Sequence, residues 1–442
     1  MRKALSGFLL TLLLLAAALP ARAQTATPDG KMTLKECVEL VLQNSPAVAI
    51  ASESVTGAEE KVSEARSQVY PQVSVLGNYL YNSLKQEFSF DFFGQTFNMK
   101  FSQPNSYDFR AGITQQLFTF GRIKNSIALS RTGVELAQTG LGLTRQAMSY
   151  QVAPLFYGVL FFREAIKVLD DNIGLLEKRL QILKERYQAG LVSSFDTSTV
   201  EVQISVLRGQ RLDFENNIRK LALGFNTLAG RPADAPFDPQ GTLAYAVSPT
   251  DKAQLLTTAQ ARRLEFEQLD RQSQVTQLGM KVARAASLPT LLAGFNYDFR
   301  NGTFPDMETI RGMWTASVTL SYPIFDGFRT KAVVAEGEST LRTLDLQRQN
   351  LLRNIGLEID TNLSDLRTIE QKIEIEKAKI KQAEDALRIA DDRYRRGLLS
   401  ATDYIESQNN LAAAQLGYLQ LVHNHILSGF SLDRAVGKSL IE

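Results

Sequence analysis

The stretch ERYQAGLVSSFD, residues 185–196, returns later in the chain as DRYRRGLLSATD, residues 392–403. The matched positions are Tyr187 and Tyr394, Gly190 and Gly397, and Asp196 and Asp403. Each pair is separated by 207 residues, and no gap is needed from Phe118, aligned with Phe325, to Gly230, aligned with Gly437. A repeat of this length predicts a fold built from two similar halves.

Upstream of Phe118 the offset changes to 218, which aligns Pro71 with Pro289. The first half therefore carries 11 extra residues between its proline and its phenylalanine. Several prolines interrupt the region that joins the two halves, which predicts an irregular linker. We accordingly expect a signal peptide over 1–23, a first repeat over 24–230, a Pro-rich linker over 231–251 and a second repeat over 252–442.

The first residues have the pattern of a secretory signal. Arg2 and Lys3 precede an apolar stretch over 8–19 and an A-x-A cleavage pattern over 21–23, so the mature chain is expected to begin near Gln24. The apolar stretch is shorter than the ~20 residues that span a bilayer, which disfavours a retained anchor. A lipoprotein would need a cysteine where Gln24 stands.

The charge balance is nearly neutral, with 49 basic and 47 acidic residues in the full chain. Removing the signal leaves the acids in excess by one, which argues against nucleic acid as a partner. Cys37 is the only cysteine, so an intramolecular disulfide is excluded. No later segment is apolar for long enough to suggest an inner-membrane helix.

Four segments alternate apolar and polar residues in the manner of β-strands. They lie near 72–82, 107–118, 290–300 and 313–323. A soluble sheet with one face on a core gives the same alternation. However, the strand length of about 9 to 11 residues and the aromatic ends fit tilted membrane strands, and three copies would supply a twelve-stranded barrel. The 11 extra residues fall in a phenylalanine-rich loop over 83–106, which is expected to face outside.

Two very long helices are expected over 122–188 and 329–395, each ~100 Å long at 1.5 Å per residue. Pro154 predicts a bend in the first of these helices only, since Thr361 stands at the matching position of the second. Apolar residues that alternate three and four positions apart predict antiparallel coiled-coil hairpins. The seam residues of the first are Ile166, Leu169, Ile173, Leu176, Leu180, Leu183 and Tyr187.

The turn of each hairpin is expected at 189–196 and at 396–403. Gly190 and Gly397 can adopt the left-handed conformation that ends a helix. For the returning helices, the expected N-caps are Ser194 in the first repeat and Thr402 or Asp403 in the second.

With these features the mature sequence resembles the TolC family of outer-membrane efflux proteins. The duplicated helix-strand-strand-helix order, the Y-x-x-G-L turns and the paired strand borders YPQ/LPT and LFTFG/IFDG carry the resemblance. It implies a mainly α-helical fold with a small β part: a homotrimer with a helical barrel in the periplasm and a twelve-stranded barrel in the outer-membrane lipid. It also implies an exit duct fed by a periplasmic adaptor and an inner-membrane transporter of RND, ABC or MFS type.

The resemblance further implies a gate at the hairpin tips. Its positions match Asp403, Glu406, Asp196 and Tyr394, while Leu399 stands where the family places an arginine. The implied adaptor-docking residues are Gly190, Leu191, Ser194, Gly397, Leu398 and Ser400. Because Asp403 and Glu406 share one helix face, a trimer would gather six carboxylates, which favours cations. Alternatively, the two acids simply suit a helix N-terminus.

A second class of function also fits long coiled coils, namely a periplasmic adaptor or an adhesive scaffold without a pore. Such proteins would lack four membrane-length strands. An enzyme is not expected, because no phosphate loop, nucleophile elbow or zinc-ligand run is present. His423 and His425 lie on different helix faces, so neither a metal site nor a cofactor is expected.

Overall fold

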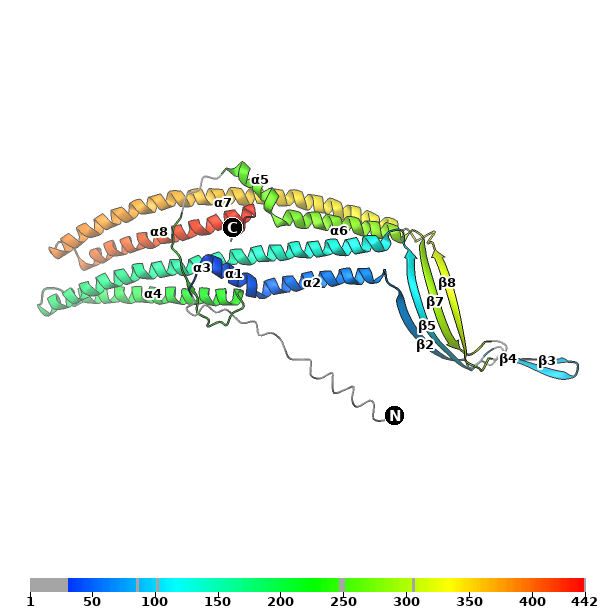
Figure 1. Ribbon diagram of the computed structural model, residues 1–442. Coiled ribbons are helices and arrows are strands. Elements are labelled where there is room, and N and C mark those ends of the chain that lie inside the picture. The colour runs from blue at the N-terminus through cyan, green and yellow to red at the C-terminus, as the bar shows by residue number, and fades with distance from the viewer. Residues whose placement is uncertain are drawn as a thin grey trace, which may run out of the picture.

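The computed structural model describes residues 31–84, 87–100, 102, 104–245, 251–303 and 307–440. The expected signal peptide lies outside these residues. The described chain is elongated, with two helical hairpins at one end and a four-stranded sheet at the other (Figure 1). No helix in this part of the chain is long and apolar enough to cross a membrane.

Each repeat runs from two short helices through a strand pair to a long helical hairpin. The first contains α1 Leu34–Asn44, α2 Pro46–Ser67, β2 Gln72–Tyr81, β5 Asn105–Phe118, α3 Arg122–Gln188 and α4 Ser194–Leu228. The second contains α5 Lys252–Arg262, α6 Leu264–Ala286, β7 Thr290–Arg300, β8 Arg311–Ser321, α7 Arg329–Arg395 and α8 Ala401–Val436. The bounds predicted for both long helices are confirmed. α3 continues through Pro154 as one helix, so a break is absent there and the bend stays a prediction.

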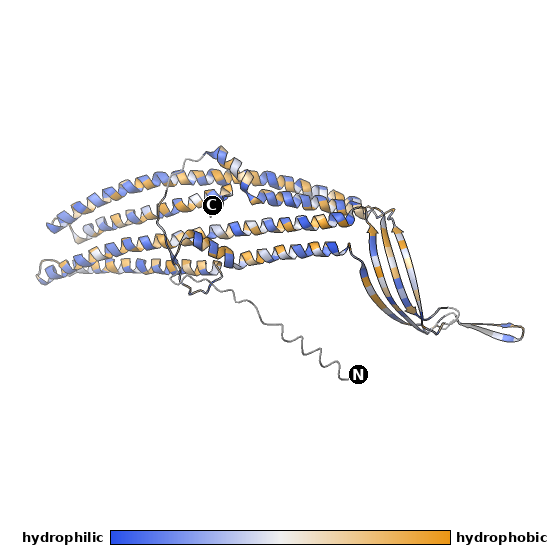
Figure 2. Ribbon diagram, in the orientation of Figure 1, coloured by the Kyte–Doolittle hydropathy of each residue, from blue (hydrophilic) through white to orange (hydrophobic). Residues whose placement is uncertain are grey.

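The four strands form one antiparallel sheet in the order β2-β5-β7-β8. Its register places Val73 opposite Ile113 and Tyr297 opposite Trp314, so apolar residues share one face of the sheet. Figure 2 shows the resulting alternation along the strands. This apolar face is open to solvent in the single chain: Val75 is 80% exposed and Trp314 67%.

The opposite face of the sheet is polar. Arg110 on β5 forms an ion pair with Asp298 on β7, and Asp298 is buried. Charged side chains are costly in contact with lipid tails. The two faces therefore differ in the environment that each can tolerate.

The strand predicted over 313–323 is displaced, since β8 covers Arg311–Ser321. Its first residue pairs with Arg300, the last residue of β7, and Pro323 beyond its end has no N–H to donate to a ladder. The loop predicted over 83–106 contains a further hairpin of β3 Glu87–Phe92 and β4 Gln95–Lys100. Phe93 and Gly94 both have positive φ, as a two-residue hairpin turn requires.

Near the middle of the molecule, each hairpin returns to the joint between its own repeat's two short helices. A Cβ on Gly230 would lie 2.7 Å from the carbonyl oxygen of Asn44, and one on Gly437 would lie 3.1 Å from the backbone of Arg262. The linker contributes β6 Asp238–Pro239, which pairs in parallel with β1 Lys31–Met32. Cys37 is buried in the apolar cluster beside this pair.

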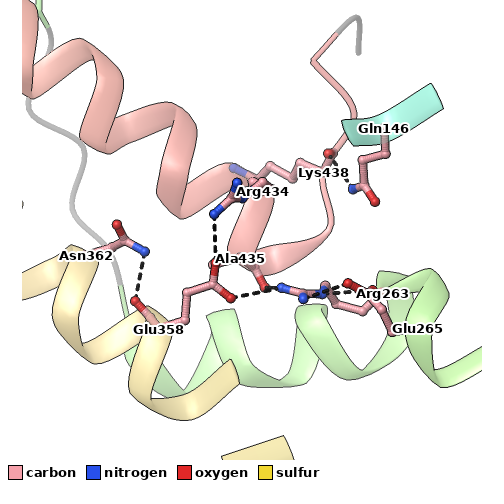
Figure 3. Close-up of polar contacts among 8 residues, drawn as sticks. All are labelled: Gln146, Arg263, Glu265, Glu358, Asn362, Arg434, Ala435 and Lys438. Atoms are coloured by element: carbon pink, nitrogen blue, oxygen red, sulfur yellow. Dashed lines mark hydrogen bonds and ion pairs between the residues drawn. The ribbon is translucent and has the colours of Figure 1, made fainter. Parts of the chain in front are cut away.

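Arg263 ties the second joint together (Figure 3). Its guanidinium donates to Glu265 at 2.7 Å, to Glu358 of α7 at 3.2 Å and to the carbonyl oxygen of Ala435 in α8 at 3.1 Å. Because these contacts join three helices around a side chain only 12% exposed, they hold the end of α8 against this joint.

Candidate functional site at the helical tips

The hairpin turns at the far end of the molecule from the sheet close in the same way. Gly190 and Gly397 have φ of 72° and 76°. In the first turn, the N–H of Gly190 donates to the carbonyl of Tyr187, and that of Leu191 donates to the carbonyl of Arg186. The second turn repeats both bonds at equivalent positions. This is the Schellman pattern, so the left-handed glycines predicted from the sequence are confirmed.

The predicted N-caps were wrong. Ser193, rather than Ser194, caps α4, and both its N–H and its hydroxyl donate to the carboxylate of Asp196. Ser400, rather than Thr402 or Asp403, caps α8, and its hydroxyl oxygen accepts from the N–H of Asp403 at 3.1 Å. In each repeat the serine three residues before the aspartate has the extended backbone that a cap needs.

A cation from the first hairpin lies between two aromatic rings of the second. The guanidinium carbon of Arg179, on α3, is 4.6 Å from the ring centroid of Tyr394 on α7 and 4.4 Å from that of Tyr404 on α8. Arg179 also donates to Asp391 of α7 at 2.6 Å, and its side chain is 12% exposed. These contacts cross from one repeat to the other, so they hold the two hairpins together near their tips.

The surroundings of this cluster are apolar. Twelve buried residues from all four hairpin helices pack there, and Leu399, at the position of the family's arginine, packs against them. Burial raises the pKa of the Tyr394 phenol, with Arg179 acting in the opposite direction and Asp196 adding to the rise. The phenol is therefore neutral at physiological pH, and its ring face is available to the guanidinium.

The structure brings some of the predicted gate residues together and not others. Tyr394 is buried in the cluster, and Asp196 lies close enough to influence its titration. Asp403 and Glu406 are exposed on the first turns of α8. The carboxylate of Asp403 accepts from the hydroxyl of Ser400 at 2.7 Å, so this acid also has a local role at the helix N-terminus.

The matching site of the other repeat lacks the cluster. Tyr187, predicted on the coiled-coil seam, is 50% exposed, whereas Tyr394 is 8% exposed. The counterparts of Arg179 and Tyr404 are Ala386 and Thr197, which supply neither a cation nor a second ring. Sequence reasoning missed Arg179. The signal that could have identified it is this difference between the repeats, next to tyrosines that match in both.

The residues assigned to adaptor docking lie at or beside the turns. Leu191 and Leu398 project from them and are 73% and 72% exposed. Phe195, one residue beyond Ser194, is 70% exposed, a further apolar group that the prediction did not include. Large apolar side chains on an exposed tip are typical of a contact surface.

No metal or cofactor chemistry emerges from the described part of the chain. His425 contacts Glu370 at 3.2 Å, and His423 lies beside Phe161 with ring centroids 5.2 Å apart. Within the described ranges no group of three or more histidine, cysteine, aspartate and glutamate side chains could hold a metal ion.

The exposed apolar sheet and the long helical hairpins together are typical of a protein that spans a membrane at one end. In agreement, residues 37–231 and 255–438 match the family described as "Outer membrane efflux protein". The chain belongs to this family, which consists of transport channels rather than enzymes. It is an outer-membrane efflux channel with a helical extension into the periplasm, and no support remains for a pore-less adaptor or scaffold.

Relatives and solved structures agree with this membership. The toluene efflux pump outer membrane protein TtgC of Pseudomonas putida is 20% identical over 416 residues, covering 91% of this chain and 82% of TtgC. The pyoverdine export outer membrane protein OpmQ of Pseudomonas aeruginosa is 24% identical over 297 residues, which cover 65% of this chain and 60% of OpmQ. The outer membrane protein VceC of Vibrio cholerae has the same fold, with a TM-score of 0.71 at 16% identity, covering 92% of this chain and 97% of VceC.

Proposed function

We propose that three copies of this chain form one exit duct, with a twelve-stranded barrel in the outer membrane and a helical tunnel below it. The observation that carries the proposal is the four-stranded sheet, whose apolar face is not covered by any other part of the described chain. Its strands of 10, 14, 11 and 11 residues have the length of membrane strands, and their apolar face is exposed. Four strands cannot enclose a channel, whereas twelve can. The polar face with Arg110 and Asp298 then lines the water-filled interior.

The tips serve as the gate and as the contact with a periplasmic adaptor, which joins the duct to an inner-membrane transporter. Threefold symmetry gathers Asp403 and Glu406 of three copies around one axis, and such a ring favours cations. The exposed Leu191 and Leu398 supply the apolar contacts for the adaptor. The names of relatives mention compounds as different as toluene and pyoverdine. A duct of this kind takes its substrates from the transporter that feeds it.

The acidic ring can be tested by conductance in planar bilayers. We expect the Asp403→Ala/Glu406→Ala variant to leak more and to prefer cations less, which shifts its reversal potential in a salt gradient toward zero. Asp403→Asn/Glu406→Gln should lose the same preference, because the charge is removed in both.

The amide variant also separates the two roles of Asp403, since an asparagine can still accept from Ser400. If the acids only stabilise the N-terminal turns of α8, the amide variant keeps the reversal potential and the conductance of the native protein, and the ring is refuted. If neither the native trimers nor trimers with both acids changed to alanine conduct, the channel proposal itself must be dropped.

A further inference from the structure

The two edge strands of the sheet, β2 and β8, can pair with each other between neighbouring copies of the chain. Among the strands that the structure describes, β2 pairs with β5 alone and β8 with β7 alone. Edge strands present unpaired N–H and C=O groups, which proteins either cover or pair. β2 and β8 run in opposite directions, so an antiparallel pairing between β8 of one copy and β2 of the next continues the sheet.

The internal repeat predicts which residues meet in that pairing. Adding 218 to the residue numbers of β2 gives the matching residues of β7, and adding 207 to those of β5 gives the matching residues of β8. The paired residues of one strand pair can therefore be compared with those of the other. The pair Val73 and Ile113 becomes Leu291 and Leu320, and both pairs are present. The pair Tyr79 and Tyr107 becomes Tyr297 and Trp314, which also holds. The repeat relation therefore preserves strand register.

Within the sheet, the two repeats meet where β5 pairs with β7. There Ala111 lies opposite Tyr297, and Phe109 lies opposite Phe299. Adding 207 converts residues of β5 into those of β8, and subtracting 218 converts residues of β7 into those of β2. We propose that β8 pairs with β2 of the neighbouring copy in the register that places Val318 opposite Tyr79 and Ala316 opposite Tyr81. This inference rests on the proposed trimer.

This register keeps the chemistry of both faces continuous. Val318, Ala316, Tyr79 and Tyr81 all belong to the apolar face, and the pairing places β-branched and aromatic side chains side by side. A slip of one residue would set apolar side chains against the polar face, which strongly disfavours it. A slip of two residues preserves the faces, so it is the alternative that an experiment must separate.

An open groove beside β8 agrees with the same register. It has a volume of about 640 Å³ and is lined by Tyr322, Pro323, Ile324, Phe325 and Phe328, among others. Ile324 and Phe325 are 89% and 72% exposed. The pair Phe118 and Leu291 at the bulge between β5 and β7 maps onto Phe325 and Val73 of the neighbouring copy. The proposed register therefore places the start of the neighbour's β2 beside this groove, whose lining also includes polar residues of α6 and α7.

Cysteine pairs test the register in the outer membrane. Directly opposite residues lie within the Cα separation that a disulfide spans, whereas residues two positions off lie at about 7–8 Å and exceed it. After mild oxidation, Ala316→Cys/Tyr81→Cys and Val318→Cys/Tyr79→Cys should give covalent dimers and trimers that a reductant returns to monomers. The slipped pairs, Ala316→Cys/Tyr79→Cys and Val318→Cys/Tyr81→Cys, contain the same four substitutions and should crosslink at least about tenfold less.

The natural thiol does not interfere, because Cys37 is fully buried and burial raises its pKa to about 12. Conductance of the same variants in bilayers separates the possible failures. Strong crosslinking of a slipped pair instead of the expected ones overturns the register. Variants that conduct but crosslink in neither register overturn the pairing of β8 with β2, while the channel stands. Failure of every cysteine variant, of the native protein and of Asp403→Ala/Glu406→Ala to conduct refutes the proposed function instead.

Discussion

At the residue scale, Arg179 joins the two hairpins near their tips, and we expect its contacts to favour a closed tip. It is the only residue of the first repeat in cation–π contact with the two tyrosines of the second among the described residues. A partly buried cation–π contact contributes ~0.5–2 kcal/mol. Because the ion pair with Asp391 adds to it, losing the side chain should shift the balance of closed and open tips by about 5–30-fold.

Arg179→Ala should therefore raise the resting conductance of single channels in planar bilayers. Arg179→Lys should give an intermediate value, because lysine retains the charge but lacks the planar group that stacks on both rings. Arg388→Ala is the matched control, since Arg388 is exposed and pairs with Asp385 of its own helix. If Arg179→Ala and Arg388→Ala conduct alike, the contact does not hold the tip closed.

At the scale of elements, the two joints near the middle of the molecule set where the hairpins end. Gly230 and Gly437 have left-handed backbones, and a Cβ added to either would lie close to the backbone of its own repeat's joint. An alanine in that conformation costs about 1–3 kcal/mol, and the contact distances make the cost larger at Gly230. Both Gly230→Ala and Gly437→Ala should lower the melting temperature of the detergent-solubilised protein, followed by far-UV circular dichroism.

Gly174→Ala provides the control for these joint variants. Gly174 lies in α3 with no atom within 4 Å of an added Cβ, so alanine should leave the melting temperature unchanged or raise it, as expected for a better helix former. A joint variant as stable as this control would show that the close approach carries no cost.

The elements themselves could largely be predicted from the sequence because their signals are local. Gly190 and Gly397 end α3 and α7 by a conformation that glycine alone adopts easily. The N-caps were misplaced because adjacent polar residues such as Ser193 and Ser194 offer equal capping chemistry, and only the backbone distinguishes them. Arg179 could not be found in this way, since its contact with Asp391 joins residues 212 positions apart.

At the scale of the whole molecule, the single chain leaves surfaces uncovered that a folded protein normally buries. Its sheet exposes an apolar face, and among the described strands β2 and β8 lie at its edges, at the end of the molecule opposite the hairpin tips (Figure 1). Exposed apolar surface of this kind is stable only in contact with lipid or with further protein. The function therefore depends on assembly rather than on any single cluster of side chains.

The most direct test of this claim is the mass of the protein extracted from the outer membrane, measured by light scattering with the detergent contribution subtracted. We predict three chains per particle, and precipitation when the detergent is removed. A stable particle of one chain that stays in solution without detergent would contradict the account.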